Sequence, residues 1–102
     1  MDIDMAKVRR EQIRWILVLA LNHARPYGAQ ESVLLGAVQG LYTDATPLEI
    51  RRELGYLEDR CMVELTKAPY GPWSAELTRL GVDIAEYTVD CNPGIARPAK
   101  YW

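Results

Sequence analysis

The sequence has few residues that bind metal ions or form disulfides. Its 102 residues include two cysteines, Cys61 and Cys91, and one histidine, His23, and they contain no Cys-x-x-Cys pair. This scarcity excludes a zinc finger, an iron–sulfur site and a disulfide scaffold, so we expect no metal and no other cofactor. Because Cys61 continues the apolar stripe of a predicted helix, we expect it to lie in the core.

Long apolar segments are absent as well. The longest apolar run, Trp15–Leu21, has seven residues, whereas a membrane span needs about 20. The first residues, Met-Asp-Ile-Asp-Met, lack the basic region and the apolar stretch of a secretory signal. These absences predict a cytoplasmic protein that has no membrane partner.

The sets of residues that carry out catalysis are also missing. The sequence has no Gly-x-Gly-x-x-Gly motif, no Walker loop and no nucleophile matched to a base. His23 follows the apolar run of the first predicted helix, where the helix dipole favours a cation. Glu58 and Asp59 are most simply a solvated helix face. We therefore predict that the protein is not an enzyme.

Neither sign of charge dominates the chain. Twelve Lys and Arg residues stand against 14 Asp and Glu residues, which gives a net charge of −2. This balance indicates neither a protein that coats nucleic acid nor an acidic tail. The chain is 49% apolar and 25% charged, which together with its length is typical of one globular domain with a single core.

The first predicted helix, from about Asp4 to Ala24, is apolar on two sides and ends before Pro26 and Gly28. At about 100° per residue, one face carries Ile13, Leu17, Ala20 and Ala24, and the other carries Trp15, Val18 and Leu19. Both sides must be buried. The second side is covered either by Ile84, Tyr87 and the C-terminal tail of the same chain, or by a second copy. The second alternative predicts a homodimer through helix 1 (Trp15, Val18, Leu19) or through the C-terminal region.

Two shorter helices are predicted in the middle of the chain. The first, Glu31–Leu41, has apolar residues at helical spacing, namely Val33, Leu34, Ala37, Val38 and Leu41. The second begins at Thr46-Pro47-Leu48-Glu49, where Thr46 is the N-cap, Pro47 takes the first helical position and Glu49 can reach back to the cap. Its inward stripe is Ile50, Leu54, Leu57 and Cys61.

The last third of the chain changes period. Residues 62–65 and 74–77 suit two short strands, and the Pro- and Gly-containing segment 66–72 between them predicts the tip of a β-hairpin. Residues 78–87 predict a helix with Thr78 as its cap and Leu80, Ile84 and Tyr87 inside. Residues 88–102 are expected to run extended over the surface, with Ile95, Tyr101 and Trp102 docked on the body.

This order of helix, helix, helix, hairpin and helix resembles a winged helix-turn-helix domain. Leu54–Leu65 looks like the end of a recognition helix that runs into the first wing strand, and Leu77-Thr78-Arg79-Leu80-Gly81 is similar to the start of the final helix in bacterial regulators. The resemblance implies an α+β fold, mainly α with a small β-hairpin. It gives a winged helix-turn-helix domain over residues 1–87 and an extended C-terminal tail over residues 88–102.

The chain also resembles, more loosely, the small ArsR-type winged-helix proteins of Mu-like prophages. The segment Pro93-Gly94-Ile95-Ala96-Arg97-Pro98 contributes to this resemblance. Metal sensing is not implied, because the clustered thiols of such sensors are absent.

The resemblance implies that the helix from Pro47 enters the major groove of double-stranded DNA. Arg52 would then bind a guanine and Arg51 a phosphate, and Tyr56 would contact the sugar-phosphate backbone or else pack under the wing. The wing tip offers Lys67 and Tyr70. The predicted DNA-binding residues are Leu48, Arg51, Arg52, Tyr56, Lys67 and Tyr70.

The local charge weighs against DNA binding. Residues 31–65 hold three basic and seven acidic residues, a net charge of −4, and affinity for DNA comes mainly from neutralised phosphates. Two functions therefore stay open. The first is a DNA-binding protein, a small bacterial or prophage transcriptional regulator. The second is a winged-helix adaptor that binds other proteins in a phage or DNA-handling complex and does not bind DNA by itself.

Overall fold

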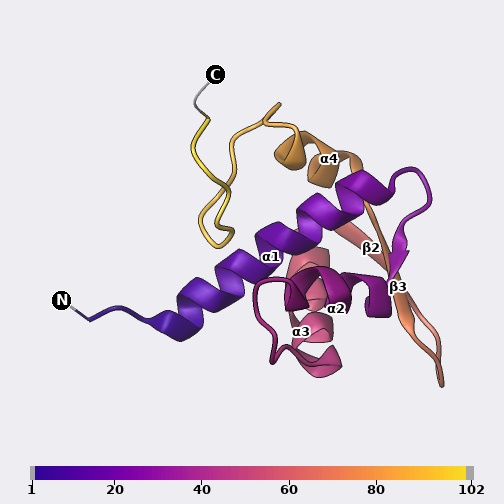
Figure 1. The fold of residues 1–102 in the computed structure, drawn as a ribbon. Coiled ribbons are helices and arrows are strands. Elements are labelled where there is room, and N and C mark those ends of the chain that lie inside the picture. Colours follow the sequence, from indigo (N-terminus) through magenta and orange to yellow (C-terminus); the bar gives the residue numbers. More distant parts are fainter. Residues whose placement is uncertain (1, 101–102) are drawn as a thin grey trace.

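The helices and strands follow the predicted order (Figure 1). The computed structural model describes residues 2–100. Its elements are α1 (Met5–Ala24), β1 (Ala29–Gln30), α2 (Glu31–Gln39), α3 (Pro47–Asp59), β2 (Val63–Lys67), β3 (Trp73–Leu77) and α4 (Arg79–Ala85). The fold is α+β, mainly α with a small β-hairpin, and it is a winged helix-turn-helix, as predicted.

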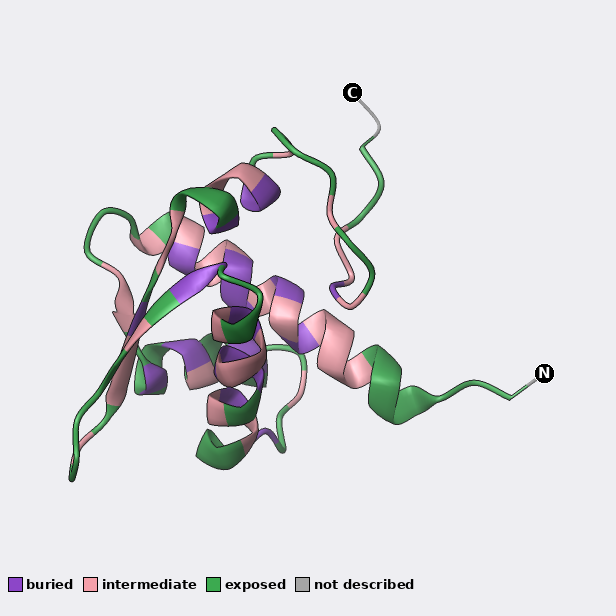
Figure 2. Ribbon diagram, turned by 180° about the vertical axis from the view of Figure 1, so that it is seen from behind, coloured by how far each residue is buried: buried purple, intermediate pink, exposed green. Residues whose placement is uncertain are grey.

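Both apolar sides of α1 are buried within one chain (Figure 2). Ile13 and Leu17 face the core that α1 shares with α2 and α3, while Trp15 lies on the other side. The Trp15 ring packs edge-on against Tyr87, with ring centroids 6.2 Å apart. Of the two alternatives for this side, the structure therefore shows the first, in which the same chain covers it. Trp15 and Val18 are buried and do not form an exposed surface for a second copy.

The apolar residues of α2 divide between the core and the surface. Leu34 and Val38 are fully buried. Val33 and Leu41, which belong to the same predicted set, are 62% and 58% exposed. Because α2 ends at Gln39, Leu41 falls in the turn that follows, outside the packed helix.

The predicted start of α3 is only partly correct. The Thr46 side chain caps the helix by accepting a hydrogen bond from the Glu49 amide at 3.3 Å. The Glu49 carboxylate does not complete a capping box, because both of its oxygens accept hydrogen bonds from Arg9 on α1, at 2.8 and 2.9 Å. The inward residues Ile50, Leu54 and Leu57 are fully buried, as their spacing predicts.

The prediction that Cys61 lies in the core is wrong. The helix ends at Asp59, and Cys61 adopts a left-handed backbone conformation, with φ +63°. The amides of Cys61 and Met62 donate to the carbonyls of Glu58 and Leu57, both at 2.9 Å, a pattern that terminates helices. This turn exposes Cys61 and places Met62 in the core instead.

The predicted hairpin is present and gains a third strand. β2 and β3 pair antiparallel, with Leu65 opposite Ala75 and Lys67 opposite Trp73. The short strand β1, which was not predicted, pairs with the other edge of β3, so the sheet order is β1-β3-β2. Gly28, with φ +72°, lets the chain approach the Ala75 carbonyl closely just before β1. We call β2, β3 and the connecting residues 68–72 the wing.

The end of the chain returns to α1. Thr78 caps α4 as predicted, by accepting from the Gly81 amide at 3.2 Å, and Ile84 is buried. Leu80, predicted to lie inside, is exposed, because it is on the side of α4 that faces away from the core. Ile95 packs against the core, and its neighbour Ala96 donates its amide to the Glu11 carbonyl at 3.2 Å. Tyr101 and Trp102 lie outside the described residues.

Candidate nucleic-acid interface

The start of α3 and the tip of the wing project to the same side of the molecule (Figures 1 and 2). α4 and the C-terminal segment lie on the opposite side in both views. A helix and a ribbon that project together form the pair of elements with which winged helices contact a partner. The candidate interface is therefore built from the outward side of α3 and from the wing.

The outward side of α3 carries two of the predicted residues. Leu48 is 67% exposed, and Arg52 and Asp59 are exposed one and three turns further along. Arg52 forms no ion pair or hydrogen bond within residues 2–100. Gly55 lies between Arg52 and Asp59, and a Cβ added there would meet no atom within 4 Å. We call Leu48, Arg52, Gly55 and Asp59 the α3 face.

The Arg51 side chain is held against the protein surface by an ion pair with Glu31. Its Nε and Nη2 atoms donate to the two Glu31 carboxylate oxygens at 2.6 and 2.5 Å. This pairing lowers the pKa of Glu31 and raises the pKa of Arg51. Because the charge of Arg51 is neutralised in this pair, its predicted role as a phosphate ligand has little support.

The Glu31–Arg51 pair also fixes the base of the wing. Glu31 accepts a further hydrogen bond from the Trp73 amide at 3.1 Å. The Arg51 guanidinium lies 4.8 Å from the centre of the Trp73 ring and donates to the Gly71 carbonyl at 3.4 Å. One buried carboxylate thus joins α2, α3 and β3, so the wing is held at a fixed position relative to α3.

Tyr56 is not brought to the α3 face. The Arg14 guanidinium stacks on its ring at 3.5 Å, and the Arg60 guanidinium lies 5.0 Å from the ring centre. The Tyr56 hydroxyl abuts Gly94, where an added Cβ would overlap it. Tyr56 therefore packs beneath the C-terminal segment, neither under the wing nor toward a groove.

The wing presents one fully exposed aromatic residue and one cation. Tyr70 at its tip is completely exposed. Lys67 pairs loosely with Glu58 on α3, with 3.4 Å between Nζ and Oε1, and its Nζ lies 4.8 Å from the centre of the Trp73 ring. Both residues are accessible, and about half of the Lys67 side chain remains exposed.

Most acidic side chains of residues 31–65 are neutralised by ion pairs. Five of the seven have a basic partner: Glu31 with Arg51, Asp44 and Glu49 with Arg9, Glu53 with Arg14, and Glu58 with Lys67. Three of these partners, Arg9, Arg14 and Lys67, lie outside the segment, and counting them with it changes its net charge from −4 to −1. The pairing therefore removes most of the expected repulsion from DNA.

No local sequence pattern predicts these pairings. The partners in the Glu31–Arg51 and Glu31–Trp73 contacts are 20 and 42 residues apart, so no local spacing rule brings them together. The one local clue is Glu31 itself, an acidic residue in the first turn of α2, which is a favoured position whatever its partner.

Among residues 2–100, no group of three or more His, Cys, Asp or Glu side chains is placed to hold a metal ion. No helix of this part is both long enough and apolar enough to cross a bilayer.

Comparison with known proteins supports the architecture. No protein-family model matches the chain, and no curated protein matches its sequence. Among solved structures, a protein from Ralstonia eutropha JMP134 described as a "putative DNA-binding protein" superposes with a TM-score of 0.60. The match covers 87% of this chain and 100% of that chain at 19% sequence identity. At this identity the likeness concerns the fold.

Proposed function

We propose that the protein binds double-stranded DNA as a small transcriptional regulator. The α3 face enters the major groove, where Arg52 donates to a guanine and Leu48 contacts a thymine methyl group. Tyr70 and Lys67 of the wing meet the neighbouring backbone. The observation that carries this proposal is Arg52, an exposed cation on the outward side of α3 that has no partner within residues 2–100. It lies next to a wing that projects in the same direction as the start of α3.

Two other observations support DNA as the partner. The structurally similar protein from Ralstonia eutropha carries a DNA-binding description. The five ion pairs described above leave residues 31–65 close to neutral, so a duplex can approach the α3 face without strong repulsion.

A second candidate function, an adaptor that binds other proteins, has its own support. Val33, Leu41 and Leu48 are apolar side chains that are each more than half exposed on α2, the following turn and α3. Exposed apolar side chains on adjacent elements favour a protein surface over a phosphate backbone. The two candidates predict different responses to salt.

Duplex titration distinguishes the two functions. Labelled genomic fragments are titrated with the protein and followed by fluorescence anisotropy at 50 and 200 mM salt. The two cations of the interface, Arg52 and Lys67, neutralise at most two phosphate charges, so the affinity should fall by up to about 12-fold between these concentrations. Arg52→Ala should weaken binding about tenfold, because a bidentate guanine contact is worth about 1–3 kcal/mol.

Arg79→Ala is the matched control. Arg79 is an exposed arginine on α4, on the side of the molecule away from the α3 face, so its loss should leave the affinity within about twofold. If the wild-type protein binds no fragment at 50 mM salt, DNA binding is refuted and the adaptor is favoured. Equal losses from Arg52→Ala and Arg79→Ala would contradict the assignment of the α3 face.

The predicted dimer, prophage origin and cytoplasmic location stay predictions. Since Trp15 and Val18 of α1 are covered by other parts of the same chain, a dimer would use the C-terminal region, where Leu80 is an exposed apolar residue. Sedimentation of the protein at high micromolar concentration tests this, and a monomer there contradicts it.

A further inference from the structure

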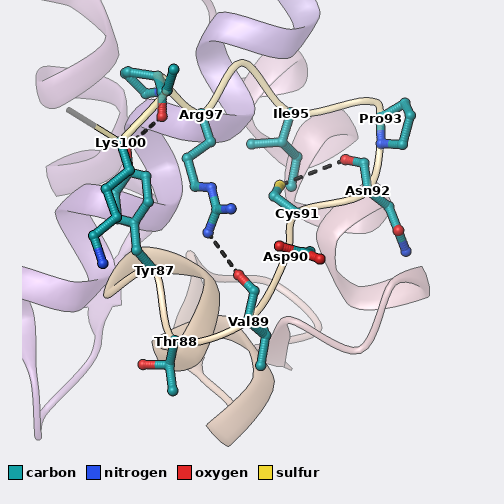
Figure 3. Close-up of a pocket in the computed structure, with 12 residues that line it drawn as sticks. Tyr87, Thr88, Val89, Asp90, Cys91, Asn92, Pro93, Ile95, Arg97 and Lys100 are labelled. Carbon is teal, nitrogen blue, oxygen red and sulfur yellow. Dashed lines mark hydrogen bonds between the residues drawn. The ribbon is translucent and has the colours of Figure 1, made fainter. Parts of the chain in front are cut away.

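The C-terminal segment curls around a cavity that is open to solvent, instead of packing flat on the body. Residues 87–100 form an irregular loop around a space of about 590 Å³ (Figure 3). This volume is within the range of about 300–1,000 Å³ that small-molecule sites occupy.

The rim of the loop is fixed by hydrogen bonds. The Tyr87 hydroxyl donates to the Pro98 carbonyl at 2.8 Å, which closes the loop on itself. On α1, Arg14 donates to the Gly94 carbonyl at 2.9 Å, and the Glu11 carbonyl accepts from the Ala96 amide at 3.2 Å. The loop is thus held at both its neck and its far end, and the cavity is a preformed feature.

Arg97 supplies a rigid cation at the cavity. Its guanidinium stacks on Tyr87 at 4.4 Å, and Nη1 donates to the carbonyls of Ile84 and Val89 at 3.1 and 2.9 Å. Figure 3 shows this guanidinium reaching into the interior of the loop. Its Nε and Nη2 donors have no partner among the described residues. A fixed guanidinium with free donors suits a carboxylate.

An acidic group and apolar groups line the same cavity. Asp90 is part of the lining and forms no ion pair with Arg97 or with any other residue in the described range. Ile95, 9% exposed, and Pro93 add apolar surface. Asp90 and Arg97 carry opposite charges at one cavity, which Lys100 also lines, and they do not pair with each other. This arrangement leaves room for a ligand that carries both charges.

We propose that this cavity binds a small zwitterion, an α-amino acid with a short apolar side chain. Arg97 holds the carboxylate, Asp90 holds the ammonium group, and the side chain lies against Ile95 and Pro93. This site lies away from the α3 face and the wing, and its occupancy is measured in the absence of DNA.

The proposal is tested with three probes that share one carbon skeleton. L-Leucine has both charges, 4-methylpentanoate lacks the ammonium group, and 3-methylbutylamine lacks the carboxylate. Each is titrated to millimolar concentration into ¹⁵N-labelled full-length protein, and the amide shifts of residues 87–100 are followed. L-Leucine should shift these amides saturably, with each single-charge probe at least about tenfold weaker, because a hydrogen bond to a charged group is worth about 1.5–3 kcal/mol.

Asp90→Asn separates binding at this site from binding elsewhere. Asp90 has no ion-pair partner, so its variant should fold, and it should bind L-leucine about tenfold more weakly while its weak binding of 4-methylpentanoate is unchanged. The matched control, Asp59→Asn on α3, should bind all three probes as the wild type does. The proposal is overturned if L-leucine produces no shift, if either single-charge probe binds as tightly as L-leucine, or if Asp90→Asn binds L-leucine normally.

Discussion

Replacement of Arg14 by leucine should destabilise the fold more than replacement of any exposed arginine. Arg14 lies on α1, and its Nε donates to Glu53 of α3 at 2.8 Å. Both side chains are removed from water, with 12% of Arg14 and 2% of Glu53 exposed. The substitution therefore strands a carboxylate inside the protein without its partner.

The expected loss has three contributions. Breaking a buried ion pair from one side costs about 3–5 kcal/mol. The hydrogen bond to the Gly94 carbonyl and the stacking on Tyr56 are lost as well, which adds about 2 kcal/mol. Since domains of this size have a total stability of about 5–15 kcal/mol, Arg14→Leu should lower Tm by roughly 20 °C or more.

A double-mutant cycle isolates the buried charge. Urea unfolding followed by tryptophan fluorescence gives the free energy of unfolding for Arg14→Leu, Glu53→Leu and the double variant. The double variant has no stranded charge, so it should be more stable than Arg14→Leu alone. Arg79→Leu is the control, because Arg79 forms an exposed pair with Asp83 that is worth about 0.5 kcal/mol. A loss below about 1 kcal/mol for Arg14→Leu, or strictly additive losses in the cycle, would refute this account of the Arg14–Glu53 ion pair.

Three further predictions follow from other contacts. Arg51 lowers the pKa of Glu31, so this pair stabilises the fold above the ordinary glutamate pKa of about 4.3 and loses its effect as the pH falls through the lower folded-state pKa. The stability difference between wild type and Glu31→Gln should therefore shrink between pH 6 and pH 3, and a constant difference in urea unfolding would contradict it. Gly94→Ala should lower Tm, since Gly94 has φ +115° and an added Cβ would overlap Tyr56. Gly55 faces open space, so Gly55→Ala should stabilise α3 by about 0.5–1 kcal/mol. Thermal melts that rank the two variants the other way contradict both assignments. A thiol reagent should modify Cys61 rapidly and Cys91 slowly, because Cys61 is exposed while burial raises the pKa of Cys91, and equal rates for the two thiols would show that this difference in environment is absent.

The parts of the fold that could be predicted from the sequence are those set by local rules. The Thr46-Pro47 start of α3 and the Thr78 cap of α4 each depend on residues within three positions. The hairpin depends on a Pro- and Gly-containing segment between two short apolar runs. Such signals depend on residues that are close together in the sequence, so these elements can be predicted without knowledge of the tertiary structure.

The wrong or missing predictions have a different origin. Cys61 fits the helical stripe, but the stripe continues only as long as the helix does, and a left-handed residue ends it. Strand β1 has two residues and forms only because β3 offers an edge. Arg51 and Tyr56 fall on the outward half of α3 by angle, yet Glu31 and Arg14 draw them away. The outcomes for β1, Arg51 and Tyr56 are each decided by a partner more than 15 residues away, which periodicity cannot detect.

The same ion pairs that orient α3 limit how the proposed DNA contact can work. Arg9, Arg14 and Arg51 are all bound to carboxylates, so they add little positive potential for a phosphate backbone. Arg52 and the partly exposed Lys67 are the cations left at the α3 face and the wing among those described. Non-specific affinity should then be weak, because it scales with the number of phosphates neutralised. On the proposed function, discrimination between base pairs by Arg52 and Leu48 has to supply most of the useful binding energy.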